Sequence, residues 1–109
     1  MAKQFVVTRN ALHWGATGVI EDVEVREYAR LGSAMRAMNE MNRRAKADMK
    51  RGYMLLPGDP EEYFAGQAQT VTMTEEGQVI AFVEYDDKGK LEDARVHGKL
   101  DVKSIYPKW

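Results

Sequence analysis

The stretch that decides the fold runs from residue 31 to residue 52 and reads LGSAMRAMNEMNRRAKADMKRG. The positions of its expected apolar side recur every three or four residues over about five turns: Leu31, Met35, Met38, Met41 or Asn42, Ala45 and Met49. This period predicts one long amphipathic helix whose apolar side packs against a sheet. Gly52 suits the position just past the helix end, and Ser33 is the candidate N-cap, although Leu31 favours an earlier start.

Two strands are expected before this helix. Residues 4–8 are rich in β-branched and aromatic side chains, which is typical of a strand. Residues 10–18, NALHWGATG, contain two glycines and predict a loop of nine residues, longer than most hairpin connections. From Val19 onward apolar and charged residues alternate, which is the period of a strand with one solvent-exposed face.

A short second helix is expected soon after the first. Asp59 can cap it, Pro60 fits the first helical position, and Glu62 completes the Asp-x-x-Glu capping pattern. The acidic residues would lie at the positive end of the helix dipole, which stabilises them there. Gly66 should end this helix after about two turns.

The remaining sequence predicts strands. Residues 70–74 alternate threonine with apolar residues, and residues 79–85 are apolar on both faces, which favours an interior strand. Turns are expected at residues 75–78 and 86–90. Beyond them, residues 91–97 and 99–106 form either two strands split by Gly98 or one long strand with a bulge.

The element order is therefore β-β-α-α-β-β-β, with an optional sixth strand. Strands grouped around a helix and joined by hairpin turns predict an α+β fold. In it an antiparallel sheet of five or six strands packs against one long amphipathic helix, and one short extra helix is added. At 109 residues the chain should form a single domain, residues 1–109.

Composition excludes several classes of protein. Without cysteine the chain has no disulfides and no thiolate metal sites, which fits a reducing, cytoplasmic location. The apolar run at residues 5–7 is too short for a signal-peptide core, and no stretch approaches the roughly 18 apolar residues of a membrane span. A membrane partner is not expected. With a net charge of −1, electrostatic recognition must come from a local patch.

Residues suited to catalysis or to cofactor binding are few. His13 and His97 belong to different predicted elements, and neither Ser33 nor Ser104 has a nucleophile motif around it. The GATG of residues 15–18 lacks the lysine of a phosphate-binding loop. Acidic residues at 86, 87, 92 and 93 do not follow calcium-loop spacing and fit a solvated turn better. We expect no enzyme activity, no cofactor and no metal.

The most informative feature is a run of cations on the predicted outer face of the long helix: Arg36, Arg43, Arg44, Lys46, Lys50 and Arg51. Such a stripe could follow a phosphate backbone or meet an acidic protein. It is also what the solvated side of an amphipathic helix looks like, since cations near the C-terminus favour the dipole. Trp14 and Trp109 are candidate aromatic contacts, and Met41 with Met54 would form a small apolar patch if both lie outside the core.

The expected function is that of a small, non-enzymatic protein-binding module. In size and style the chain is similar to accessory proteins of phages and mobile elements, including inhibitors of host defence nucleases, although no motif carries this similarity. The narrower expectation is therefore inhibition of a host factor such as a defence nuclease. The alternative is a nucleic-acid-binding domain that uses the basic face of the long helix.

Overall fold

The computed structural model describes residues 4–13, 19–56 and 58–97. Two strands, β1 (Phe5–His13) and β2 (Val19–Tyr28), precede the helix α1 (Leu31–Arg51). A short pair, β3 (Tyr53–Leu55) and β4 (Glu62–Phe64), follows the helix. The described chain then continues through β5 (Ala68–Glu75), β6 (Gln78–Tyr85) and β7 (Leu91–Val96).

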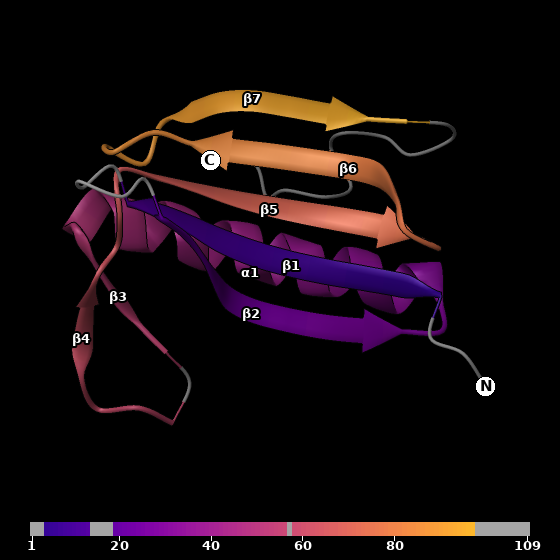
Figure 1. The fold of residues 1–109 in the computed structure, drawn as a ribbon, viewed down its shortest axis with the longest axis horizontal. Helices are drawn as coiled ribbons and strands as arrows, with labels where there is room; N and C mark the ends of the chain where they lie inside the picture. Colours follow the sequence, from indigo (N-terminus) through magenta and orange to yellow (C-terminus); the bar gives the residue numbers. More distant parts are fainter. Residues whose placement is uncertain (1–3, 14–18, 57, 98–109) are drawn as a thin grey trace.

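Five of these strands form one antiparallel sheet in the order β2-β1-β5-β6-β7. The first hairpin thus joins the meander of the last three strands through the pairing of β1 with β5. Figure 1 shows α1 running along the sheet behind β1 and β5, with β2 and β7 at the two edges. The α+β class and the antiparallel sheet packed by one long helix are confirmed.

The predicted short second helix is wrong. Residues 62–64 form β4, which pairs with β3 in a separate two-stranded sheet. Asp59 does accept a hydrogen bond two residues on, from the backbone N–H of Glu61 at 2.9 Å, but its carboxylate also accepts one from the Tyr63 hydroxyl at 2.7 Å. A local Asx turn therefore replaces the helix start, because the same side-chain oxygens can stabilise either conformation.

The first hairpin also differs from the expectation. Residues 10–13 belong to β1 rather than to a loop, and they pair with β2 on one side and, up to Leu12, with β5 on the other. Pairing on both edges favours the extended conformation despite the weak strand propensity of Asn10 and Ala11. The expected strand at residues 99–106 lies outside the described residues, whereas the one beginning at Leu91 is confirmed as β7.

The long helix begins and ends close to the predicted positions. Its N-cap is Arg30, which makes no side-chain capping bond, so Ser33 lies inside the first turn and the proposed Ser33 cap is wrong. Gly52 has φ 87° and its N–H donates to the carbonyl of Asp48 at 2.9 Å, as expected for a glycine after a helix end. Leu31, at the start, is 37% exposed and does not belong to the core.

The core lies between α1 and the sheet. The helix buries seven residues at three- and four-residue spacing: Ala34, Met38, Met41, Asn42, Ala45, Asp48 and Met49. Against them the sheet places alternate residues of β1, β5 and β6, including Val7, Met73 and Val83, each fully buried. Met41 and Met54 are both buried, so the apolar patch suggested for them is wrong. The methionines fill the irregular space between a twisted sheet and a cylinder.

Candidate functional site

The predicted basic face divides into two groups with different surroundings. Arg44 lies on the side of α1 that faces β2, where its Nε and Nη2 donate to the two carboxylate oxygens of Glu24 at 3.1 and 2.8 Å. Arg51 donates to the carboxylate of Asp48, and its guanidinium lies 5.2 Å from the centre of the Tyr53 ring. Both arginines are therefore held by the fold, which favours a structural role over recognition.

These two arginines surround a third one that the sequence did not single out. Arg9, in β1, is fully buried under the C-terminal half of α1. Its Nε donates to Oε1 of Gln69 at 2.8 Å, its Nη2 donates to Asp48, and its Nη1 lies 3.5 Å from Oε1 of Glu24. The result is an alternating chain of charges in the order Arg44, Glu24, Arg9, Asp48, Arg51.

The chain joins β1, β2 and α1, and the bond from Arg9 to Gln69 connects it to β5. Arg9 occupies a strand position on the buried apolar period, although arginine is usually a surface residue. The one available signal is its place between the apolar residues Val7 and Ala11, whose side chains alternate onto the same face. Its ion pairs connect strands to the helix, so we interpret the charge chain as stabilising the fold.

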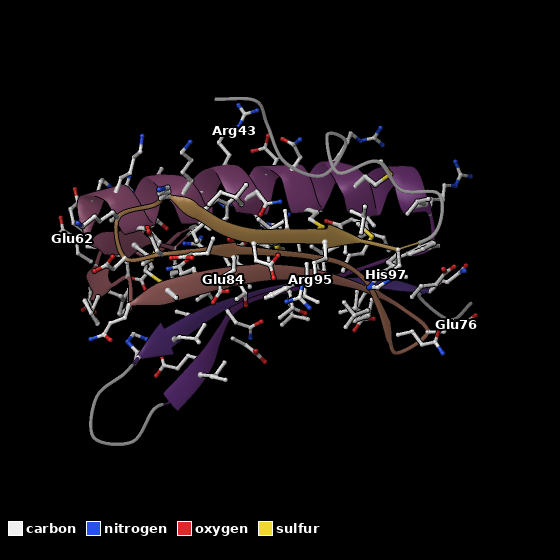
Figure 2. All side chains as sticks on the ribbon, turned by 90° about the horizontal axis from the view of Figure 1, so that it is seen from above. Arg43, Glu62, Glu76, Glu84, Arg95 and His97 are labelled. Atoms are coloured by element: carbon white, nitrogen blue, oxygen red, sulfur yellow. The ribbon has the colours of Figure 1, made fainter. Side chains whose placement is uncertain are left out.

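The second group of cations faces outward. Arg36, Arg43 and Lys50 are spaced by seven residues, about two helical turns, and make no hydrogen bond or ion pair with any described residue. Figure 2 shows Arg43 on the side of α1 away from the sheet. Lys46 lies beside Lys50, and burial together with the Lys50 charge lowers the pKa of Lys46 below its usual value. Of the six predicted cations, Arg44 and Arg51 are thus paired with carboxylates, and whether the group binds a partner stays a prediction.

The opposite side of the molecule is the face of the sheet that α1 does not cover. In Figure 2 the helix lies on one side of the sheet and no described element lies over the other, where Glu84, Arg95 and His97 are labelled. Residues of this face alternate with the buried ones along each strand, so they can be identified from the pairing register. We call it the open sheet face.

Two rows of side chains cross the open sheet face from edge to edge. One is mainly apolar or threonine and ends on a cation: Val25, Thr8, Thr72, Phe82 and Arg95. The neighbouring row is polar and acidic: Asp22, Asn10, Thr70, Glu84 and Asp93. The two rows are in contact at β7, where Arg95 donates to Asp93 at 2.7 Å. The guanidinium of Arg95 also lies 6.0 Å from the centre of the Phe82 ring.

The open sheet face carries more acid than base. Among the described residues at its paired strand positions, the face has one cation, Arg95, and four acidic residues: Asp22, Glu27, Glu84 and Asp93. On the outer side of α1, Arg36, Arg43 and Lys50 have no carboxylate partner among the described residues. Although the net charge is only −1, the charges are therefore unevenly distributed. The open sheet face is acidic, and the outer side of α1, on the opposite side of the molecule, is basic.

The two histidines are not brought together. His13 ends β1, where its ring stacks at a tilt on Phe64 with centroids 5.4 Å apart, and its Nε2 lies 3.5 Å from Glu21. His97 follows β7 and donates its backbone N–H to Ile80, which places it at the other end of the sheet. Within the described residues no group of three or more His, Cys, Asp or Glu could hold a metal ion.

Trp14 and Trp109, the candidate aromatic contacts, lie outside the described residues. No helix in the described part of the chain is both long and apolar enough to cross a membrane. Comparison with known proteins finds no matching family model, no matching curated protein and no matching solved structure.

Proposed function

We propose that the protein is a small, non-enzymatic module that binds another protein through the open sheet face. The observation that carries this proposal is the exposure of large aliphatic side chains on that face. Ile20 is 64% exposed, Val25 52% and Val79 49%, although each occupies a strand position where a polar residue would keep the sheet equally well paired.

Single exposed aliphatic residues are ordinary on protein surfaces. Here they share one face with Phe82 and Leu12, which are only partly buried, and with a set of threonines on β1 and β5. Valine and threonine on a paired strand have few rotamers, so a partner that covers them loses little side-chain entropy. The helix α1 packs against the other side of the sheet, so the open sheet face is already formed in the absence of a partner.

The charges on the open sheet face indicate the kind of partner. Carboxylates of Asp22, Glu27, Glu84 and Asp93 border the apolar row, so a complementary surface presents cations around an apolar centre. The same carboxylates would repel the phosphates of a nucleic acid or of an anionic membrane. We therefore infer a protein partner with a basic surface.

A nuclease has such a surface, because its nucleic-acid channel must attract phosphates. The specific role that we propose is inhibition of a host factor of this kind, such as a defence nuclease met by a phage or mobile element. In that role the acidic row of the open sheet face would occupy the channel in place of the nucleic-acid backbone. The absence of cysteine is compatible with a cytoplasmic site of action.

Affinity purification from the native host, with and without nuclease treatment, tests the proposal. A protein partner stays bound after the nucleic acid is digested, and its affinity for the purified chain can then be measured by calorimetry. Val25→Lys should weaken binding by about tenfold or more, since it places a cation and a long polar chain at the β2 end of the apolar row, where they would face the basic surface of the partner.

Leu55→Lys is the matched control. Leu55 is an aliphatic residue of similar exposure, 44%, but it belongs to β3 in the separate small sheet. This variant should bind within about twofold of the unmodified chain. Equal loss from both variants, or a captured partner that disappears after nuclease treatment, would contradict binding of a protein at the open sheet face.

A further inference from the structure

A cluster of lysines forms where α1 meets the turn between β6 and β7. Lys46 and Lys50 come from the helix, and Lys88 and Lys90 come from the turn. Together they surround an open depression of about 410 Å³, whose other lining residues are Gly89 and Leu91. None of the described residues that line this lysine depression is acidic.

The turn is held tightly against the helix. Gly89 is buried at φ 77°, and a Cβ added to it would lie 2.7 Å from Cγ of Lys50 and 2.8 Å from the carbonyl oxygen of Lys46. The backbone of the turn is therefore in direct contact with the helix at the two lysines. Lys88 and Lys90 flank the point of contact, so their charges are brought beside those of the helix.

Hydrogen bonds within the turn keep it in this shape. Oδ1 of Asp86 accepts from the backbone N–H of Lys90 at 2.8 Å and of Lys88 at 2.9 Å, and the Gly89 N–H donates to the Asp86 carbonyl at 3.1 Å. These bonds hold the pKa of the Asp86 carboxyl below its usual value. That carboxylate is turned to the backbone of its own turn, and the exposed Asp87 lies outside the lining of the depression.

Like charges one helical turn apart repel, and the turn adds two more to the same place. An ammonium group is a compact cation with three donors, well suited to phosphate oxygens as a point charge. We propose that the lysine depression binds an anionic ligand that carries two or more adjacent phosphate groups. This site is separate from the open sheet face and does not depend on the function proposed for it.

Two sources could supply such phosphates: a small polyphosphate, such as a nucleoside triphosphate, or the backbone of a nucleic acid. The outward cations of α1 distinguish them. Arg36 and Arg43 line no part of the depression but lie along the same helix, so a nucleic acid could reach them whereas a small polyphosphate could not.

Calorimetric titration of the full chain with inorganic triphosphate tests the site. The double variant Lys50→Gln/Lys88→Gln should weaken triphosphate binding by about tenfold or more, because it removes one cation from each side of the depression. The matched control Arg36→Gln/Arg43→Gln removes the same charge from the same surface and should leave triphosphate binding within about twofold.

Gly89→Ala tests the geometry without changing the charge. A methyl group cannot fit against the helix backbone, so the turn must shift and triphosphate binding should weaken although all the lysines remain. Backbone amide NMR of the unmodified chain should show the largest shifts on adding triphosphate at residues 46, 50 and 88–91. Shifts confined to other residues would contradict the assignment.

A short single-stranded oligonucleotide separates the two sources. If the ligand is a nucleic acid, the oligonucleotide binds more tightly than triphosphate, and Arg36→Gln/Arg43→Gln flattens its salt dependence by about 1.4 log units per log unit of salt, from roughly 0.7 per contact. If the ligand is a small polyphosphate, the protein binds triphosphate, and the oligonucleotide binds no more tightly than triphosphate does. No binding of either probe at physiological salt, or binding that Lys50→Gln/Lys88→Gln leaves unchanged, overturns the proposal.

Discussion

Replacing Arg9 by methionine should destabilise the protein more than any surface arginine substitution. Methionine keeps an unbranched apolar stem of similar length in the β1 position, so the change removes charge and hydrogen bonds rather than volume. What remains are carboxylates of Asp48 and Glu24, whose side chains are 4% and 8% exposed, and the amide oxygen of Gln69, which loses its donor.

Removing one partner of a buried ion pair typically costs about 3–5 kcal/mol, because the other charge stays buried without compensation. Here Asp48 keeps Arg51 and Glu24 keeps Arg44, which reduces the penalty. We therefore expect the lower end of that range, about 3 kcal/mol of unfolding free energy.

Urea denaturation of both proteins measures this loss as a shift of the midpoint at constant slope. Arg95→Met is the control, since the side chain of Arg95 is 70% exposed in its pair with Asp93 and should contribute no more than about 1 kcal/mol. In the double variant Arg9→Met/Asp48→Asn the cost should be smaller than the sum of the single costs. A loss below about 1 kcal/mol for Arg9→Met would refute the view that the charge chain stabilises the fold.

Three further outcomes follow from the structure. Met38→Ala should cost about 2–5 kcal/mol in the same assay, because Met38 is fully buried between helix and sheet. Arg44→Gln should cost about 1 kcal/mol and Arg43→Gln only a few tenths, since only Arg44 is held by a carboxylate of β2. The hydrogen bond to Asp59 raises the pKa of Tyr63 to about 12. An alkaline ultraviolet titration should find this raised pKa, and Asp59→Asn should return it toward its ordinary value. The stability that this bond adds is present below the ordinary tyrosine pKa and is lost as the pH rises through about 12.

Local pattern was sufficient for most of the fold. The helix of residues 31–51 follows from its apolar period and from Gly52. The turn at Glu76-Gly77 follows from Gly77, which has φ 85°, although Glu76 also takes a positive φ of 50°. Both depend on interactions within a few residues. The prediction of a short helix after Asp59 was wrong because its local signal is ambiguous. A capping residue stabilises an Asx turn as readily as a helix start, and the pairing of β4 with β3 decides between the two.

The sequence by itself determined the α+β class, the long helix with its cations, and the absence of disulfides and thiolate metal sites. Only the tertiary structure decided what each cation does. Arg44 and Arg51 stand beside Arg43 and Lys50 in the sequence. The first two face buried carboxylates, whereas Arg43 faces away from the sheet and Lys50 lies against the β6–β7 turn.

The same is true of the surfaces from which we infer binding. Lys88 lies 38 positions from Lys50 along the chain, and they meet because Gly89 lets the β6–β7 turn contact the helix. The acidic and apolar rows of the open sheet face come from strands at both ends of the chain, aligned by backbone pairing. Helical periodicity is set by neighbours in sequence, whereas partners across a core or a sheet are set by strand order and register, which no local pattern encodes.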